Sequence, residues 1–106
     1  MKKYKKVVIN KCFGGFSLSK AVYDELGIEW SGYGYIENED LDIESNDSYA
    51  YRVDERLIKA IKKIGVKKAS GIHAELKIVR IPIDVKYTIE EYDGLEHIAE
   101  VHRTWS

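Results

Sequence analysis

The sequence predicts one α+β domain spanning residues 1–106, in which a mostly antiparallel sheet of about four strands carries two helices on one face. Three observations support this prediction. Segments near both ends of the chain are rich in β-branched residues, a central apolar stripe repeats with the period of a helix, and Asp93-Gly94 is a strong hairpin signal. The length of 106 residues accommodates one hydrophobic core and hardly two.

The first two elements flank a glycine turn. Residues 4–11 are rich in valine and isoleucine and predict a strand, which ends at the glycine pair 14–15. A short helix follows, with Ser17 or Ser19 as its N-cap and Gly27 in the position of a left-handed C-cap.

Residues 28–51 carry no clear helix or strand pattern. They include an aromatic-glycine segment, residues 30–35, which is typical of a strand edge or a packed loop and is also a candidate rim for a binding site. We call residues 37–47 the acidic tract, because their charged side chains are all carboxylates. The tract is interpreted as a solvated, partly mobile loop, with an acidic recognition surface as the alternative.

The second helix is predicted by its apolar spacing. Asp54 is placed to cap it, Gly65 marks its end, and lysines occupy the opposite face. The apolar stripe with helical spacing consists of Leu57, Ile58, Ile61 and Ile64.

The last third of the chain predicts three strands. Residues 74–81 form the first, which Pro82 ends, and residues 85–92 and 95–103 form a hairpin around Asp93-Gly94. A two-residue turn fixes the register, which pairs Tyr92 with Leu95, Glu90 with His97 and Ile89 with Ile98.

Composition excludes several classes of protein. With Lys+Arg 17 against Asp+Glu 18, the net charge is -1, so a general binder of duplex nucleic acid is not expected. Any role with nucleic acid would need a local patch of positive charge. A single cysteine cannot form an intramolecular disulfide, which favours a reducing cytoplasm. No stretch approaches the roughly 20 apolar residues of a membrane helix, and no signal peptide is expected.

Catalytic and metal-binding patterns are weak. Cys12 is a conceivable nucleophile but fits a small buried residue at a strand end better, and Glu90 opposite His97 fits a routine cross-strand pair. His97 and His102 are five residues apart, which places them on opposite strand faces and not in a shared metal site. We therefore expect no enzyme activity, no cofactor and no metal.

The glycine turn is a candidate anion site. A strand, a glycine turn and a helix start bring unpaired backbone N–H groups together, the serines add hydroxyl donors, and a phenylalanine could stack on a base. An equally good interpretation is a tight turn whose phenylalanines belong to the core. The candidate ligand-binding residues here are Phe13, Gly14, Gly15, Phe16, Ser17 and Ser19.

The C-terminal residues offer a second set of candidates. His102, Arg103 and Trp105 combine an imidazole, a guanidinium that pairs with phosphate and an indole that stacks on flat rings. The alternative is that Trp105 pins the tail onto the sheet.

Three motifs together resemble a family of short bacteriophage and prophage proteins. They are Cys12-Phe13-Gly14-Gly15-Phe16-Ser17-Leu18-Ser19, the Arg-x-Asp-x-x-Leu-Ile stretch that starts at Arg52, and the ending from Glu90 to His102-Arg103-Thr104-Trp105. The resemblance implies a counter-defence protein of the infected host's cytoplasm, similar to oligomeric sponges that sequester nucleotide immune signals. It points to residues 13–19, Arg52 and residues 102–105 as ligand contacts.

Three functions follow as hypotheses. The first is a non-enzymatic homo-oligomer that holds a phosphorylated nucleotide, such as a cyclic ADP-ribose isomer or a cyclic oligonucleotide, in a pocket between subunits, with Arg52 and Arg103 adding charge. The second is an inhibitor whose acidic tract imitates nucleic acid. The third is a small phosphodiesterase-like enzyme that uses His97 or His102.

Overall fold

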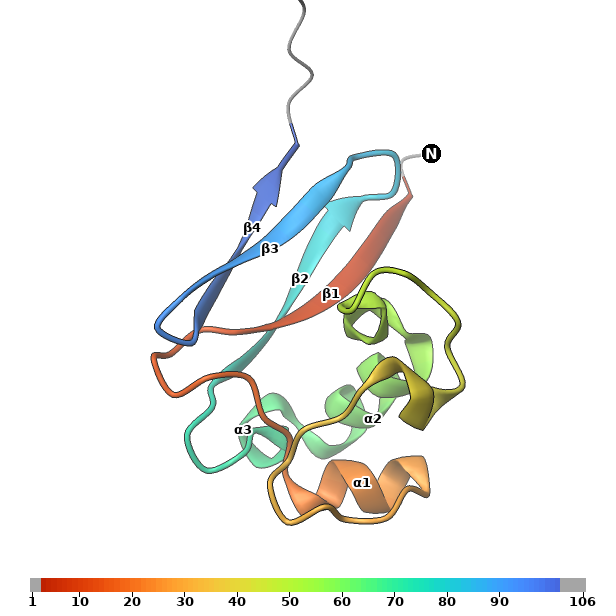
Figure 1. The fold of residues 1–106 in the computed structure, drawn as a ribbon, viewed down its shortest axis with the longest axis vertical. Coiled ribbons are helices and arrows are strands. Elements are labelled where there is room, and N and C mark those ends of the chain that lie inside the picture. The colour runs from red at the N-terminus through yellow and green to blue at the C-terminus, as the bar shows by residue number, and fades with distance from the viewer. Residues whose placement is uncertain (1–2, 102–106) are drawn as a thin grey trace, which may run out of the picture.

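The computed structural model describes residues 3–101 and confirms the α+β class. Strands and helices are segregated, with the strands at one end of the molecule and the helices at the other (Figure 1). The elements in chain order are β1 (Tyr4–Asn10), α1 (Lys20–Leu26), the 3₁₀ helices η1 (Asn38–Leu41) and η2 (Ala50–Val53), α2 (Glu55–Ile64), α3 (Val66–Ala69), β2 (Leu76–Pro82), β3 (Tyr87–Tyr92) and β4 (Leu95–Glu100).

The four strands form two antiparallel pairs. β1 pairs with β2, with Val7 opposite Val79, and β3 pairs with β4. In the second pair Tyr92 lies opposite Leu95 and Ile89 opposite Ile98, which confirms the predicted register. The sheet is therefore divided into two ribbons of two strands, and each ribbon buries one face against the other.

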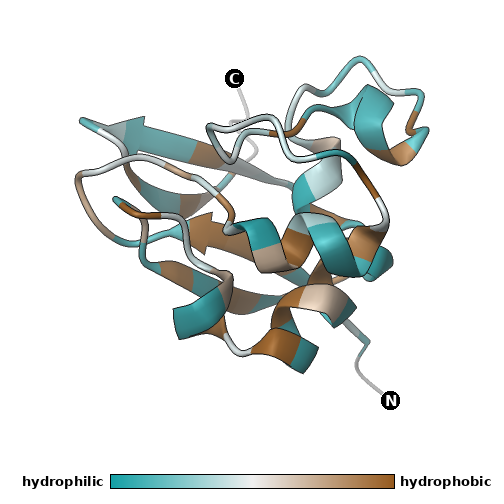
Figure 2. Cartoon of the chain, turned by 90° about the horizontal axis from the view of Figure 1, so that it is seen from below, coloured by the Kyte–Doolittle hydropathy of each residue, from teal (hydrophilic) through white to brown (hydrophobic). Residues whose placement is uncertain are grey.

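The β1–β2 ribbon lies between the helices and the β3–β4 hairpin. Val8 belongs to the larger core, which it shares with α1 and α2, while Val7 and Ile9 point to the other side and pack against Ile89 and Ile98. The helices thus cover one face of β1–β2, as predicted. Brown and teal bands alternate along these helices because one face of each is apolar and the other polar (Figure 2).

The helix boundaries follow the local signals. Ser19 is the N-cap residue of α1, although its hydroxyl makes no capping bond, and Gly27 ends the helix in the left-handed region with φ of 73°. Asp54 caps α2 by accepting a hydrogen bond from the backbone N–H of Arg56 at 2.9 Å. Gly65 breaks the helix as predicted, but a further turn, α3, follows it and was not predicted.

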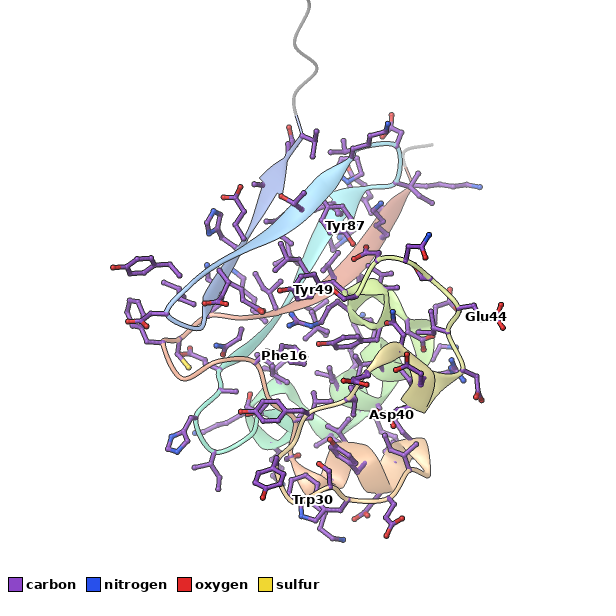
Figure 3. The ribbon with its side chains drawn as sticks, viewed as in Figure 1. Phe16, Trp30, Asp40, Glu44, Tyr49 and Tyr87 are labelled. Atoms are coloured by element: carbon purple, nitrogen blue, oxygen red, sulfur yellow. The ribbon has the colours of Figure 1, made fainter. Side chains whose placement is uncertain are left out.

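The acidic tract is more folded than the sequence suggested. The Asn38 side chain closes the loop, because its Nδ2 donates to the carbonyl of Asp47 at 2.9 Å and its Oδ1 accepts from the Tyr51 N–H at 3.0 Å. Leu41 is buried in the larger core. The carboxylates nevertheless face solvent, and Glu44 lies at the outer edge of the molecule (Figure 3).

Asp54 gives a prediction on stability. Burial alone would raise the pKa of this carboxyl, but hydrogen bonds from the side chain and backbone of Arg56 outweigh burial and hold the pKa below its usual value. The stabilisation is therefore present above the unfolded-state pKa of about 3.9 and is lost as the pH falls through the lower folded-state pKa. Asp54→Ala should lower the free energy of unfolding by about 1 kcal/mol at pH 7.

Asp54→Asn separates the cap from the charge, because an amide oxygen also caps a helix. We expect this variant to keep most of the stability at pH 7 and to show a weaker loss between about pH 5 and pH 2 than the parent protein. Urea unfolding at several pH values measures both effects. Parallel pH curves for the parent and Asp54→Asn would contradict this account of the carboxylate.

Candidate functional site

A cleft of about 430 Å³ opens where three segments distant in the sequence meet. We call it the aromatic cleft. Residues 14–20 form its floor, the aromatic-glycine segment lies along one side, and residues 70–73 lie along another. Its lining residues are Gly14, Ser17, Leu18, Ser19, Lys20, Trp30, Gly32, Tyr33, Tyr35, Ser70, Gly71, Ile72 and His73.

The floor is an extended stretch of backbone held from both sides. The Leu18 N–H donates to the carbonyl of Gly34 at 2.8 Å, and the Ser19 N–H donates to the carbonyl of Ala69 at 2.8 Å. The Gly71 N–H donates to the carbonyl of Ser17 at 3.0 Å. The backbone donors of Leu18 and Ser19 are therefore committed to the fold, which removes two of the N–H groups expected to bind an anion.

Two glycines allow the segments to approach this closely. A Cβ at Gly14 would overlap the carbonyl oxygen of His73, and a Cβ at Gly71 would overlap the side chain of Ser17. Neither glycine has a positive φ, so the lack of a side chain, and not an unusual backbone angle, is what these positions need. Gly14 of the predicted motif thus positions the cleft.

The aromatic side of the cleft is anchored through Tyr23 of α1. Its ring packs edge to face on Trp30, with centroids 4.9 Å apart, and its hydroxyl donates to the carbonyl of Tyr35. Burial raises the pKa of Tyr23, so this hydroxyl stays a donor at neutral pH. Tyr33 and Tyr35 are left exposed at the rim, with 78% of Tyr33 accessible. Figure 3 shows Trp30 beside α1.

Polar groups at the cleft are few. Lys20 is exposed and forms a surface ion pair with Asp24 at 3.2 Å, which a ligand can displace at little cost. His73 is also exposed. The hydroxyl oxygen of Ser19 is buried and has no hydrogen-bond partner among residues 3–101, whereas the Ser70 hydroxyl bonds to the Val66 carbonyl and the Leu76 N–H.

Arg52 lies in the interior and not in the cleft. It is 3% exposed, and its two terminal nitrogens bind the carboxylate of Glu96 at 2.7 and 2.9 Å. The guanidinium carbon lies 3.5 Å from the ring centroid of Phe16. Phe16 is also buried and lies near the middle of the molecule in Figure 3. The structure thus gives both residues a role inside the fold, so neither belongs to the candidate site.

The remaining residues of the glycine turn lie beside the cleft. Phe13 is exposed, and Gly15 is close to the hairpin turn at Gly94. Ser17 lines the cleft but is largely buried. The predicted contacts His102, Arg103 and Trp105 lie outside the described residues.

Sequence reasoning missed several residues that hold the site. Asn10 is fully buried and bonds to the carbonyls of Cys12 and Gly94, both at 2.7 Å, and to the Glu75 N–H at 2.8 Å. Its place at the end of an apolar strand was a usable signal, since a buried amide needs several partners. Nothing in the sequence marked residues 70–73.

The weaker catalytic candidates lie at two places, on the hairpin and at the glycine turn. Glu90 and His97 form the predicted cross-strand pair at 3.1 Å, exposed on the hairpin. The Cys12 thiol donates to the carbonyl of His73 at 3.0 Å. Within residues 3–101 no three His, Cys, Asp or Glu side chains are grouped to hold a metal ion, and no helix there is long and apolar enough to cross a membrane.

Comparison of the chain with protein-family models, with curated proteins and with solved structures finds no significant match.

Proposed function

We propose that this protein is a non-enzymatic binding protein that takes a phosphorylated nucleotide into the aromatic cleft. The observation that carries the proposal is the meeting of the glycine-turn motif with exposed aromatic rings in one cavity of about 430 Å³. Cavities of roughly 300–1,000 Å³ are usual for small ligands. Proteins commonly hold a nucleotide base by stacking its flat ring on a tyrosine or tryptophan side chain, whichever base it is.

The chemistry of the cleft supports each part of such a ligand. Tyr33 and Tyr35 offer ring faces for the base, and Lys20 offers a cation for a phosphate. The Ser19 hydroxyl is buried without a partner among the described residues, and it would meet the ligand after rotation of its side chain. α1 has only seven residues, so its dipole is too weak to hold an anion alone. Lys20 therefore supplies most of the attraction.

In this proposal the protein is a homo-oligomer, and a neighbouring subunit completes the cleft. Apolar side chains at the rim support this, since Ile72 is 95% exposed and Tyr33 is 78% exposed. The biological role that we propose is sequestration of a nucleotide immune signal, a cyclic ADP-ribose isomer or a cyclic oligonucleotide, in a bacterium infected by a phage.

Calorimetric titration with cyclic ADP-ribose and cyclic di-AMP tests the proposal. Tyr33→Ala should weaken binding by about tenfold or more, because one stacked base contributes about 1–3 kcal/mol. Tyr92→Ala is the matched control: Tyr92 is 74% exposed but does not line the cleft, and its removal should leave affinity unchanged. Equal losses in both variants, or no heat with any such nucleotide, would refute the proposal.

The second candidate function is inhibition of a nucleic-acid-binding partner by the acidic tract. The observation that favours it is that the tract is folded by Asn38 and Leu41 while its carboxylates stay exposed, which presents a fixed array of negative charge. Replacing those acids with serine and asparagine distinguishes the two functions. A nucleotide binder should keep its affinity, whereas an acidic inhibitor should lose its activity.

A further inference from the structure

A second hollow lies on the opposite side of α2 from α1, between that helix and the start of β1. It is a groove of about 560 Å³, which we call the lysine groove. Its lining residues are Tyr4, Lys5, Lys6, Val53, Glu55, Ile58, Lys59, Lys62 and Ile83. It shares no lining residue with the aromatic cleft.

Three lysine side chains reach the groove from two walls. Lys6 comes from β1, and Lys59 and Lys62 come from α2, one helical turn apart on its exposed face. Lys5 also borders the groove, but strand alternation turns its side chain to the other face of β1, where its ammonium lies 4.8 Å from the centroid of the Tyr87 ring. Within residues 3–101 none of these lysines forms an ion pair. Glu55 is the single carboxylate among the lining residues, so the groove has a net positive charge.

The positive charges crowd one another. The side chain of Lys62 lies beside Lys6 and lowers its pKa, first through their contact and then through its charge, and burial and Arg80 lower it further. Like charges that lie close together repel each other. An anion placed between the two walls would relieve this repulsion.

The floor of the groove strengthens its field. Val53 and Ile58 are apolar, and Tyr4 and Ile83 are exposed at its edge. The Arg80 guanidinium adds positive charge nearby, since it lies 4.9 Å from the centroid of the Tyr4 ring in a cation–π contact. A concave surface lined by one sign of charge over an apolar floor focuses the potential and attracts oppositely charged ligands.

We propose that the lysine groove is a second anion-binding site, separate from the aromatic cleft, for a ligand that carries several phosphate groups in a row. Lysine ammonium groups bind phosphate as point charges, and charges on two walls suit a short chain of phosphates better than a single ion. Such a chain is a free oligophosphate or the backbone of a single-stranded nucleic acid. Both present the same chemistry to the groove.

Calorimetry with inorganic triphosphate tests the site. The variant Lys59→Gln/Lys62→Gln should bind at least about tenfold more weakly than the parent protein, a loss of about 1.4 kcal/mol. Lys67→Gln/Lys68→Gln is the matched control, since it removes the same charge from exposed lysines of α3 that do not line the groove. The control should bind within about twofold of the parent.

Three outcomes would overturn the proposal. These are no binding of triphosphate by the parent protein, equal losses in the two double variants, and a full loss in Tyr33→Ala, which would place the triphosphate in the aromatic cleft. All exchanged lysines are exposed, so circular dichroism should show an unchanged fold. An oligothymidylate of about eight nucleotides identifies the source of the phosphate chain. If it binds more tightly than triphosphate and with a steeper salt dependence, the ligand is a nucleic-acid backbone. If it binds more weakly, the ligand is a free oligophosphate.

Discussion

Replacing Glu96 with glutamine should lower the free energy of unfolding by about 3–5 kcal/mol, although the two side chains have the same shape. The substitution removes the charge that balances Arg52 and leaves a guanidinium buried without a counterion, which is among the most destabilising changes in a protein interior. A loss of this size is a large part of the total stability of a small domain.

The contacts around the pair explain the size of the effect. Glu96 Oε1 accepts from Arg52 at 2.7 Å and also from the backbone N–H of Asn10 at 2.8 Å, while Arg52 donates to the carbonyl of Val8 at 3.2 Å. Burial by itself would lower the pKa of Arg52, but Glu96 and Tyr51 together outweigh burial and raise the pKa, so the arginine stays charged. The ionic contact therefore joins η2 to β4, and the two backbone hydrogen bonds tie the pair to β1.

Glu90→Gln is the matched control on the same hairpin. Glu90 pairs with His97 at 3.1 Å, but both side chains are more than half exposed, and exposed pairs contribute at most about 1 kcal/mol. Urea unfolding of both variants measures the difference. If Glu96→Gln lost no more stability than Glu90→Gln, the pair would not be the link between the hairpin and the rest of the domain.

Gly14→Ala should abolish ligand binding in the aromatic cleft and lower stability by about 1–3 kcal/mol. A Cβ at this position would overlap the carbonyl oxygen of His73, a backbone atom that cannot rotate away. The turn and residues 71–73 would have to separate, and the cleft between them would change shape. Thermal unfolding and nucleotide calorimetry measure the two effects.

Lys11→Ala serves as the control for Gly14→Ala. Lys11 lies just before the same turn, its side chain is exposed, and its backbone bond to Glu75 does not depend on the side chain. Its loss should change stability by about 0.5 kcal/mol or less. Normal affinity in Gly14→Ala would show that this close approach does not shape the binding site.

Local signals in the sequence were sufficient where neighbouring residues decide the structure. Asp93 and Gly94 adopt positive φ values of 54° and 90°, as a two-residue hairpin turn requires, and the predicted register follows from that turn. Asp54 caps α2 for an equally local reason. The stacking of the hairpin on β1–β2 was not predictable in this way, because no local pattern specifies which face one ribbon presents to another.

Long-range contacts account for what the sequence did not reveal. Asn10 and Glu96 are 86 positions apart, and their bond exists only in the folded chain. A clue was present, since strand alternation places Glu96 on the same face as Ile98, and a carboxylate on an apolar face needs a cation. The family resemblance instead pointed to Arg52 as a ligand contact, and a guanidinium is equally suited to phosphate.

The most direct test of the central claim is a nuclear magnetic resonance titration of the isotope-labelled protein with cyclic ADP-ribose and cyclic di-AMP. The amide signals of Gly14, Tyr33 and Gly71 border the aromatic cleft and should shift together on binding. Signals from Tyr87 and Glu100, at the end of the hairpin opposite the turn, should stay in place. Shifts confined to the hairpin or to the lysine groove, or no shifts at all, would contradict the claim that the aromatic cleft binds a nucleotide.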